Sequence, residues 1–242
     1  MSEEIKNDSK EQSAEKKTFF TEAKIEIIVA IMLGITAVLT AWATWIASLH
    51  GGNQATSYAE SNNYSALGNS SWNEASQNLM QDMIFWNNYY EMVINRDFAY
   101  EDGDMDSVEK YEYMMDVLLQ NNCSEALAEA IDWAMEEEEA TGYVVSPFEK
   151  EGFVDSYYEE AQEYLAISEE CLASGQQSNK WGDKLNLVTV IYAVVLFLLG
   201  IVGIFKKIPN RVIIIAISAV GFVVATIYMC TIPLPTSGGI FG

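Results

Sequence analysis

The stretch IEIIVAIMLGITAVLTAWATWIASL, residues 25–49, decides the fold of this chain. It contains one ionisable side chain, Glu26, at its start. Two further apolar runs, residues 185–205 and 212–232, carry no charged side chain. A helix that crosses ~30 Å of hydrocarbon needs about 20 such residues, and its peptide groups bond internally. The three runs therefore predict three transmembrane helices that contact the lipid bilayer.

Charge is concentrated away from these runs. The 242-residue chain has a net charge of −22, and residues 50–184 alone hold 28 Asp and Glu against 5 Lys and Arg. So acidic a segment repels nucleic acid and anionic headgroups, and we expect no nucleic-acid partner. It predicts one acidic domain on one side of the membrane.

The cations near the ends of the spans predict the orientation. Lys16, Lys17 and Lys24 precede the first span, and three cations lie in the turn between the second and third. Lys180 and Lys184, before the second span, argue weakly the other way. We predict a multi-pass protein of the cell membrane with a cytoplasmic tail (1–24), a first span (25–49), an extracytoplasmic acidic domain (50–184), a second span (185–205), a cytoplasmic turn (206–211), a third span (212–232) and an extracytoplasmic tail (233–242).

The first span is also open to interpretation as a cleaved signal peptide, with Ala41-Trp42-Ala43 as the cleavage site. Signal peptides have an apolar core of ~7–15 residues after a compact basic start. The first span is longer and lacks that start, so an uncleaved anchor is the preferred interpretation.

The acidic domain has the periodicity of helices. Apolar positions from Trp72 recur in steps of three and four through Ala75, Leu79, Met83 and Trp86, which is typical of one helix face. Ala55, Ala59 and Ala66 place small side chains on the same face upstream. Strands are not predicted.

Capping signals divide the rest of the domain. Ser124 predicts a helix start and Gly142 a helix end, and Ser146-Pro147-Phe148-Glu149 is a further start signal. We predict an all-α fold, in which the first and last helices of the acidic domain continue the first two spans and two middle helices cap or flank them.

Three motifs resemble those of an uncharacterised family of three-pass prokaryotic membrane proteins with an extracytoplasmic helical domain. They are W-x-x-W-x-x-S at residues 42–48, G-x-Q-A-x-x-Y at 52–58 and S-P-F at 146–148. The resemblance implies a topology and no chemistry.

Hydroxyl side chains recur every four residues along the first span, at Thr36, Thr40, Thr44 and Ser48. The preferred interpretation is helix packing, because small polar residues allow close approach. The alternative is the lining of a pore in a homo-oligomer.

Other candidate residues are few. Gly221 and Ala225 form a small-xxx-small pair, which predicts helix packing in the third span. Cys123 and Cys171 form a candidate disulfide if the outer compartment is oxidising. We predict no metal site, because the spacing Asp102, Asp104, Asp106 lacks the glycine and the glutamate of a calcium loop. The run Glu136–Glu139, three N-x-S sequons and the lone His50 are each best explained as surface features.

No cofactor or catalytic residue is predicted, because the chain has one histidine and no phosphate-binding glycine loop. The spans also lack the buried ionised residues of coupled transporters. We expect a non-enzymatic, homo-oligomeric membrane protein whose outer domain serves interaction or sensing with an unknown extracytoplasmic partner. A channel subunit lined by the hydroxyl row is the alternative, and an outer-face hydrolase is a third hypothesis.

Overall fold

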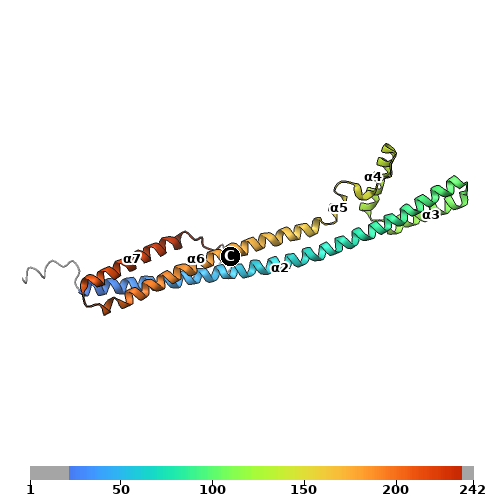
Figure 1. The fold of residues 1–242 in the computed structure, drawn as a ribbon. Helices are drawn as coiled ribbons and strands as arrows, with labels where there is room; N and C mark the ends of the chain where they lie inside the picture. The colour runs from blue at the N-terminus through green and yellow to red at the C-terminus, as the bar shows by residue number, and fades with distance from the viewer. Residues whose placement is uncertain (1–21, 236–242) are drawn as a thin grey trace, which may run out of the picture. The chain divides into compact units, whose positions relative to one another are not determined.

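The computed structural model describes residues 22–235, and every regular element in this range is helical (Figure 1). Three of these helices are long and apolar enough to cross a membrane. The all-α prediction is thus confirmed. Most of the predicted N-terminal and C-terminal tails lies outside the described residues. The elements are α2 (Glu22–Asp102), α3 (Met105–Asn122), α4 (Glu125–Thr141), the 3₁₀ turn η1 (Pro147–Glu149), α5 (Phe153–Ser156), α6 (Glu159–Ile201), the 3₁₀ turn η2 (Val202–Ile204) and α7 (Ile208–Cys230).

The described chain forms two compact units, to both of which α2 and α6 contribute. The first unit comprises residues 22–58 and 173–235, and the second comprises residues 59–172. The second unit is thus shorter than the acidic segment 50–184. The ends of that segment belong instead to the unit that holds the apolar helices.

The first unit is a bundle of three helices, α2, α6 and α7. Ala47 of α2 lies against Gly182 of α6, and Tyr58 lies against Gly175, so these two helices are antiparallel. A buried cluster holds the bundle together, and Tyr192 adds a 2.9 Å hydrogen bond to the Thr226 hydroxyl. The cluster consists of Ala43, Ile46, Ala47, Leu185, Val188, Tyr192, Ala225 and Ile232.

Large apolar side chains cover the outside of this bundle. Val38 on α2, Phe197 on α6 and Val220 on α7 are each about two-thirds exposed. Exposed apolar area costs roughly 25 cal/mol per Å² in water but nothing in hydrocarbon. A bundle that is apolar outside as well as inside is typical of helices in lipid.

Caps fix the helix ends in the second unit, as predicted at two positions. Ser124 accepts a hydrogen bond from the Leu127 N–H at the start of α4. Gly142 ends α4 in the left-handed conformation, with φ of 75°. Between α2 and α3, Gly103 also has positive φ, and Asp104 caps α3.

The predicted start signal at Ser146-Pro147 opens one short turn rather than a long helix. Ser146 caps η1, but Gly152 then takes a φ of 78° and interrupts the helix. The long helix α6 begins only at Glu159.

The apolar face predicted on α2 from Trp72 onward is buried only in part, and Ala75 is its one fully buried member. Trp72 and Met83 are 44% and 48% exposed, respectively. The buried residues of α2 in this unit are Ser61, Gly68, Ala75, Asp82, Phe85 and Tyr89; five of them recur every seven positions, and the first four are small or polar. Close approach of α6 buries the first two: the Ser168 hydroxyl bonds the Ser61 carbonyl at 2.8 Å, and a Cβ on Gly68 would lie 2.8 Å from the Leu165 Cγ.

Candidate functional site

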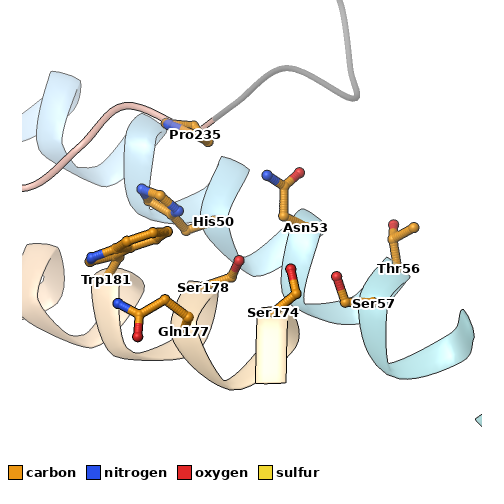
Figure 2. Close-up of a pocket in the computed structure, with 9 residues that line it drawn as sticks. All are labelled: His50, Asn53, Thr56, Ser57, Ser174, Gln177, Ser178, Trp181 and Pro235. Carbon is orange, nitrogen blue, oxygen red and sulfur yellow. The ribbon is translucent and has the colours of Figure 1, made fainter. Parts of the chain in front are cut away.

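A cavity of about 400 Å³ lies in the first unit (Figure 2). Its lining residues follow the first predicted span, precede the second or follow the third. Side chains of α2 line one side and side chains of α6 the other, and Pro235 comes from the segment after α7. Figure 2 shows His50 and Trp181 at one end, and Thr56 and Ser57 at the other. The lining residues are His50, Asn53, Thr56, Ser57, Ser174, Gln177, Ser178, Trp181 and Pro235.

His50 is fully buried at this cavity. Its Nε2 lies 3.1 Å from the Pro233 carbonyl oxygen, and its ring centroid lies 5.4 Å from that of Trp181. A carbonyl oxygen only accepts, so Nε2 carries the proton and Nδ1 holds a lone pair. The Nδ1 atom is buried and has no hydrogen-bond partner. Since buried polar atoms are normally paired, this nitrogen marks an incomplete site.

Two glycines bring α2 and α6 together on either side of the cavity. A Cβ on Gly175 would lie 2.5 Å from the Tyr58 ring, and one on Gly182 would lie 3.9 Å from the His50 Cβ. The first glycine is required for close contact, because no real Cβ fits at that distance. The backbones are thus held in place while the side chains between them leave a space.

The four hydroxyl residues of the first span lie in different environments. Thr36 is fully buried within the bundle, whereas Thr44 and Ser48 are exposed. Four residues turn a helix about 40° beyond one full turn, so the row winds from the inside to the outside. Thr40 and Thr44 donate hydrogen bonds to the carbonyls four residues before them, at 2.7 and 2.8 Å.

Gly221 and Ala225 lie at the contact of α7 with α6. A Cβ on Gly221 would lie 3.1 Å from a Val195 methyl group, and Ala225 is fully buried. These two small residues thus lie at a helix contact within one chain.

A different row of small residues follows the exposed face of α2. It alternates steps of four and three residues, which is the heptad spacing of supercoiled helices. A Cβ on Gly34 or on Gly51 would meet nothing within 4 Å, so packing inside the chain does not require these glycines. The exposed small stripe, as we call it, consists of Ala30, Gly34, Ala37, Ala41, Thr44, Ser48, Gly51 and Ala55.

One carboxylate is buried in the second unit. Asp82 of α2 is 7% exposed and accepts hydrogen bonds from the Ser124 hydroxyl, at 2.8 Å, and from the Tyr157 hydroxyl. Burial first, and then this hydrogen bond, raise the pKa of Tyr157 above its usual range. Burial and the charge of Asp82 also raise the pKa of the Cys123 thiol. Asp82 thus joins α2 to the start of α4 and to the segment before α6.

The Cys123–Cys171 disulfide predicted from the sequence is not formed, and all three cysteines are free. Cys123 precedes Ser124, which contacts Asp82. Cys171 lies three residues after Ser168, which contacts Ser61. Because α2 rises 1.5 Å per residue, Ser61 and Asp82 are about 30 Å apart. A disulfide requires Cα atoms within about 7 Å.

Asp104, one of the three aspartates with the spacing of a calcium loop, serves helix capping instead. Asp104 accepts hydrogen bonds from the backbone N–H and the hydroxyl of Ser107, and the hydroxyl bond lowers the pKa of Asp104 most. Between residues 22 and 235, no group of three or more His, Cys, Asp or Glu is placed to hold a metal ion.

Sequence reasoning missed both Asp82 and the role of His50. Asp82 carried a usable signal, since it lies seven residues after Ala75 and seven before Tyr89 in a register of small and aromatic residues. His50 carried little signal, because its surroundings come from α6 and from the segment after α7. In comparisons with protein-family models, curated proteins and solved structures, nothing matches this chain.

Proposed function

We propose that this chain is a non-enzymatic, multi-pass protein of the cell membrane that recognises a small ligand outside the cell. The observation that carries the proposal is the cavity lined by His50, a residue whose buried Nδ1 lacks a hydrogen-bond partner. Concave sites with a few convergent polar groups are the usual form of small-molecule sites.

The lining favours binding over catalysis. It contains amides, hydroxyls, one imidazole and one indole, but no carboxylate, thiol or amine. Among the described residues, the serines that line the cavity make no hydrogen bond to His50. A hydrolase would instead require a concave site that gathers several of the acidic residues, so the hydrolase hypothesis has little support.

The binding role is tested by ligand-linked stability of the full-length protein in nanodiscs. A ligand at 100 times its dissociation constant stabilises the folded state by about 2.7 kcal/mol. We expect a total polar extract of the source cells to raise the melting temperature of the wild type but not of Ser174→Phe, which fills the cavity. Ala173→Phe, at an exposed neighbour outside the lining, is the matched control. Equal melting temperatures with and without extract would argue against a binding role.

The orientation rests on the cations near the span ends, with the acidic unit outside the cell. Single cysteines at Asn210 and Glu139, in a chain otherwise free of cysteine, test it in intact cells. A membrane-impermeant maleimide should label the cysteine at 139 at once, and that at 210 only after permeabilisation. The opposite labelling pattern would reverse the topology.

We further propose that the protein is a homo-oligomer in which α2 packs against α2 of a second copy. The exposed small stripe supports this arrangement, because small residues at heptad spacing let two helices approach closely. An interior helix glycine costs roughly 1 kcal/mol relative to alanine, and no contact within the chain offsets this cost at Gly34 or Gly51.

Native mass measurement tests the assembly. Gly34→Leu should dissociate the particle into monomers, because a bulky side chain separates the two backbones. Gly200→Leu is the matched control, since Gly200 on α6 also has nothing within 4 Å of a built Cβ. A wild-type particle that is strictly monomeric would refute the proposal.

The second candidate function is a subunit of a channel. It is supported by Thr44 and Ser48, which are exposed on the same stripe. In an oligomer of four or more copies around α2, their hydroxyls would face the axis. The burial of Thr36 argues against a continuous row of hydroxyls. Conductance in planar bilayers that is lost in Thr44→Leu would favour a channel over a binding protein.

A further inference from the structure

We infer that the cavity beside His50 binds a neutral polyhydroxyl group, the chemistry of a sugar ring. The inference rests on the proposed binding function and names its ligand class. Three properties of the site carry it: the free lone pair on Nδ1, the uncharged lining, and an indole at the cavity wall.

The tautomer of His50 defines what the ligand must offer. Because Nε2 donates to the Pro233 carbonyl, Nδ1 is left as an acceptor without a donor. A ligand that completes the site must therefore bring an O–H or N–H group. The fully buried ring does not turn to water to satisfy this atom.

The rest of the lining narrows the choice to hydroxyls. Serine and threonine hydroxyls and the amide of Gln177 both donate and accept, and a polyhydroxyl group is complementary to both roles. The lining offers no charged side chain that would pair with a phosphate, carboxylate or ammonium group. Because an unpaired ion is costly to remove from water, the site favours a neutral ligand.

The shape of the cavity is also suitable. Its volume of about 400 Å³ lies near the lower end of the range for small-molecule sites, ~300–1,000 Å³. Trp181 is half-buried and lines the end beside His50 (Figure 2). The C–H face of a sugar ring is apolar and packs well on such an aromatic side chain.

The position of the site allows two sources of the same chemistry. His50 directly follows the predicted first span, and Trp181 lies four residues before the second. This is the depth at which headgroups lie and at which tryptophan is enriched. A glycolipid headgroup and a free saccharide would thus both reach the cavity.

The lone histidine makes the test direct. Full-length protein with ¹⁵N-labelled histidine, purified without a histidine tag and held in phosphatidylcholine nanodiscs, should show one Nε2–H and one unprotonated Nδ1. Methyl β-glucoside, or nanodiscs containing glucosyl diacylglycerol, should move the Nδ1 resonance as it gains a donor. A shift with both probes, or with the glycolipid alone, supports the inference and identifies the source.

Variants and a charged probe complete the design. Ser174→Phe should weaken glucoside binding about tenfold or more, while Ala173→Phe should leave it unchanged. Nanodiscs that contain phosphatidic acid, whose anionic headgroup has no sugar-like hydroxyls, should leave Nδ1 unmoved. The inference is overturned if no neutral probe moves Nδ1, or if the anionic lipid moves it equally. If the cell extract still stabilises the wild type in that case, the binding role stands and only the ligand class is wrong.

Discussion

Replacing Asp82 by alanine should loosen the second unit at the junction of α2, α4 and the segment before α6. The carboxylate accepts hydrogen bonds from Ser124 and Tyr157, and bonds to a charged group contribute roughly 1.5–3 kcal/mol each. Removing a buried negative charge from a chain of net charge −22 offsets part of the stability lost with these two hydrogen bonds. We therefore expect a net loss of about 2–4 kcal/mol.

Hydrogen exchange of the full-length protein in nanodiscs measures this loss locally. At 1.36 kcal/mol per factor of ten, protection at the start of α4 should fall about 30- to 900-fold. Glu91→Ala, at an exposed position of the same helix, is the control. The double variant of Asp82→Ala with Tyr157→Phe should cost less than the sum of the two single variants, because both remove one shared bond. An effect of Asp82→Ala no larger than that of Glu91→Ala, or strict additivity, would refute the assigned role of this carboxylate.

Three further predictions concern packing, pH and redox state. Gly68→Ala should destabilise the second unit by about 1–3 kcal/mol, because the new Cβ would lie 2.8 Å from Leu165. Gly52→Ala should instead stabilise α2 by up to about 1 kcal/mol, because nothing lies within 4 Å of its Cβ. Thermal melts compare the two variants. The folded-state pKa of Tyr157 is raised, so its contribution to stability is fully present below the unfolded pKa of about 10 and is lost as pH rises above it. Near-UV circular dichroism should show this loss, and Tyr157→Phe should reduce it. Under mild oxidation, mass spectrometry should find no Cys123–Cys171 bridge within one chain.

Much of the helical framework follows from local sequence. Ser124 starts a helix and Gly142 ends one because a hydroxyl cap and a left-handed glycine act within a few residues of their own position. The first predicted span lies within α2, the second covers the end of α6 and the turn η2, and the third covers most of α7 and the two residues after it. Ser146 likewise starts a helical turn, but η1 ends at Glu149, and Gly152 with positive φ precedes α5.

The contacts between helices did not follow from the apolar pattern. The apolar face predicted from Trp72 onward includes side chains that are largely exposed, whereas small residues such as Gly68 occupy buried positions. Close backbone approach buries a glycine more fully than it buries a tryptophan, and no hydrophobicity pattern reports it. The disulfide prediction failed for a related reason. Sequence spacing does not show that Cys123 and Cys171 lie beside positions of α2 that are far apart.

Composition alone identifies three segments apolar enough for lipid and places the charge between the first two, because transfer into hydrocarbon depends on composition summed over a run. The packing of the helices establishes which face of α2 is buried, that Asp82 is enclosed, and that His50 has one nitrogen without a partner. Those properties depend on which backbone lies opposite each residue. His50 meets Trp181, 131 positions later in the chain, and Pro233, 183 positions later, only after the helices have packed.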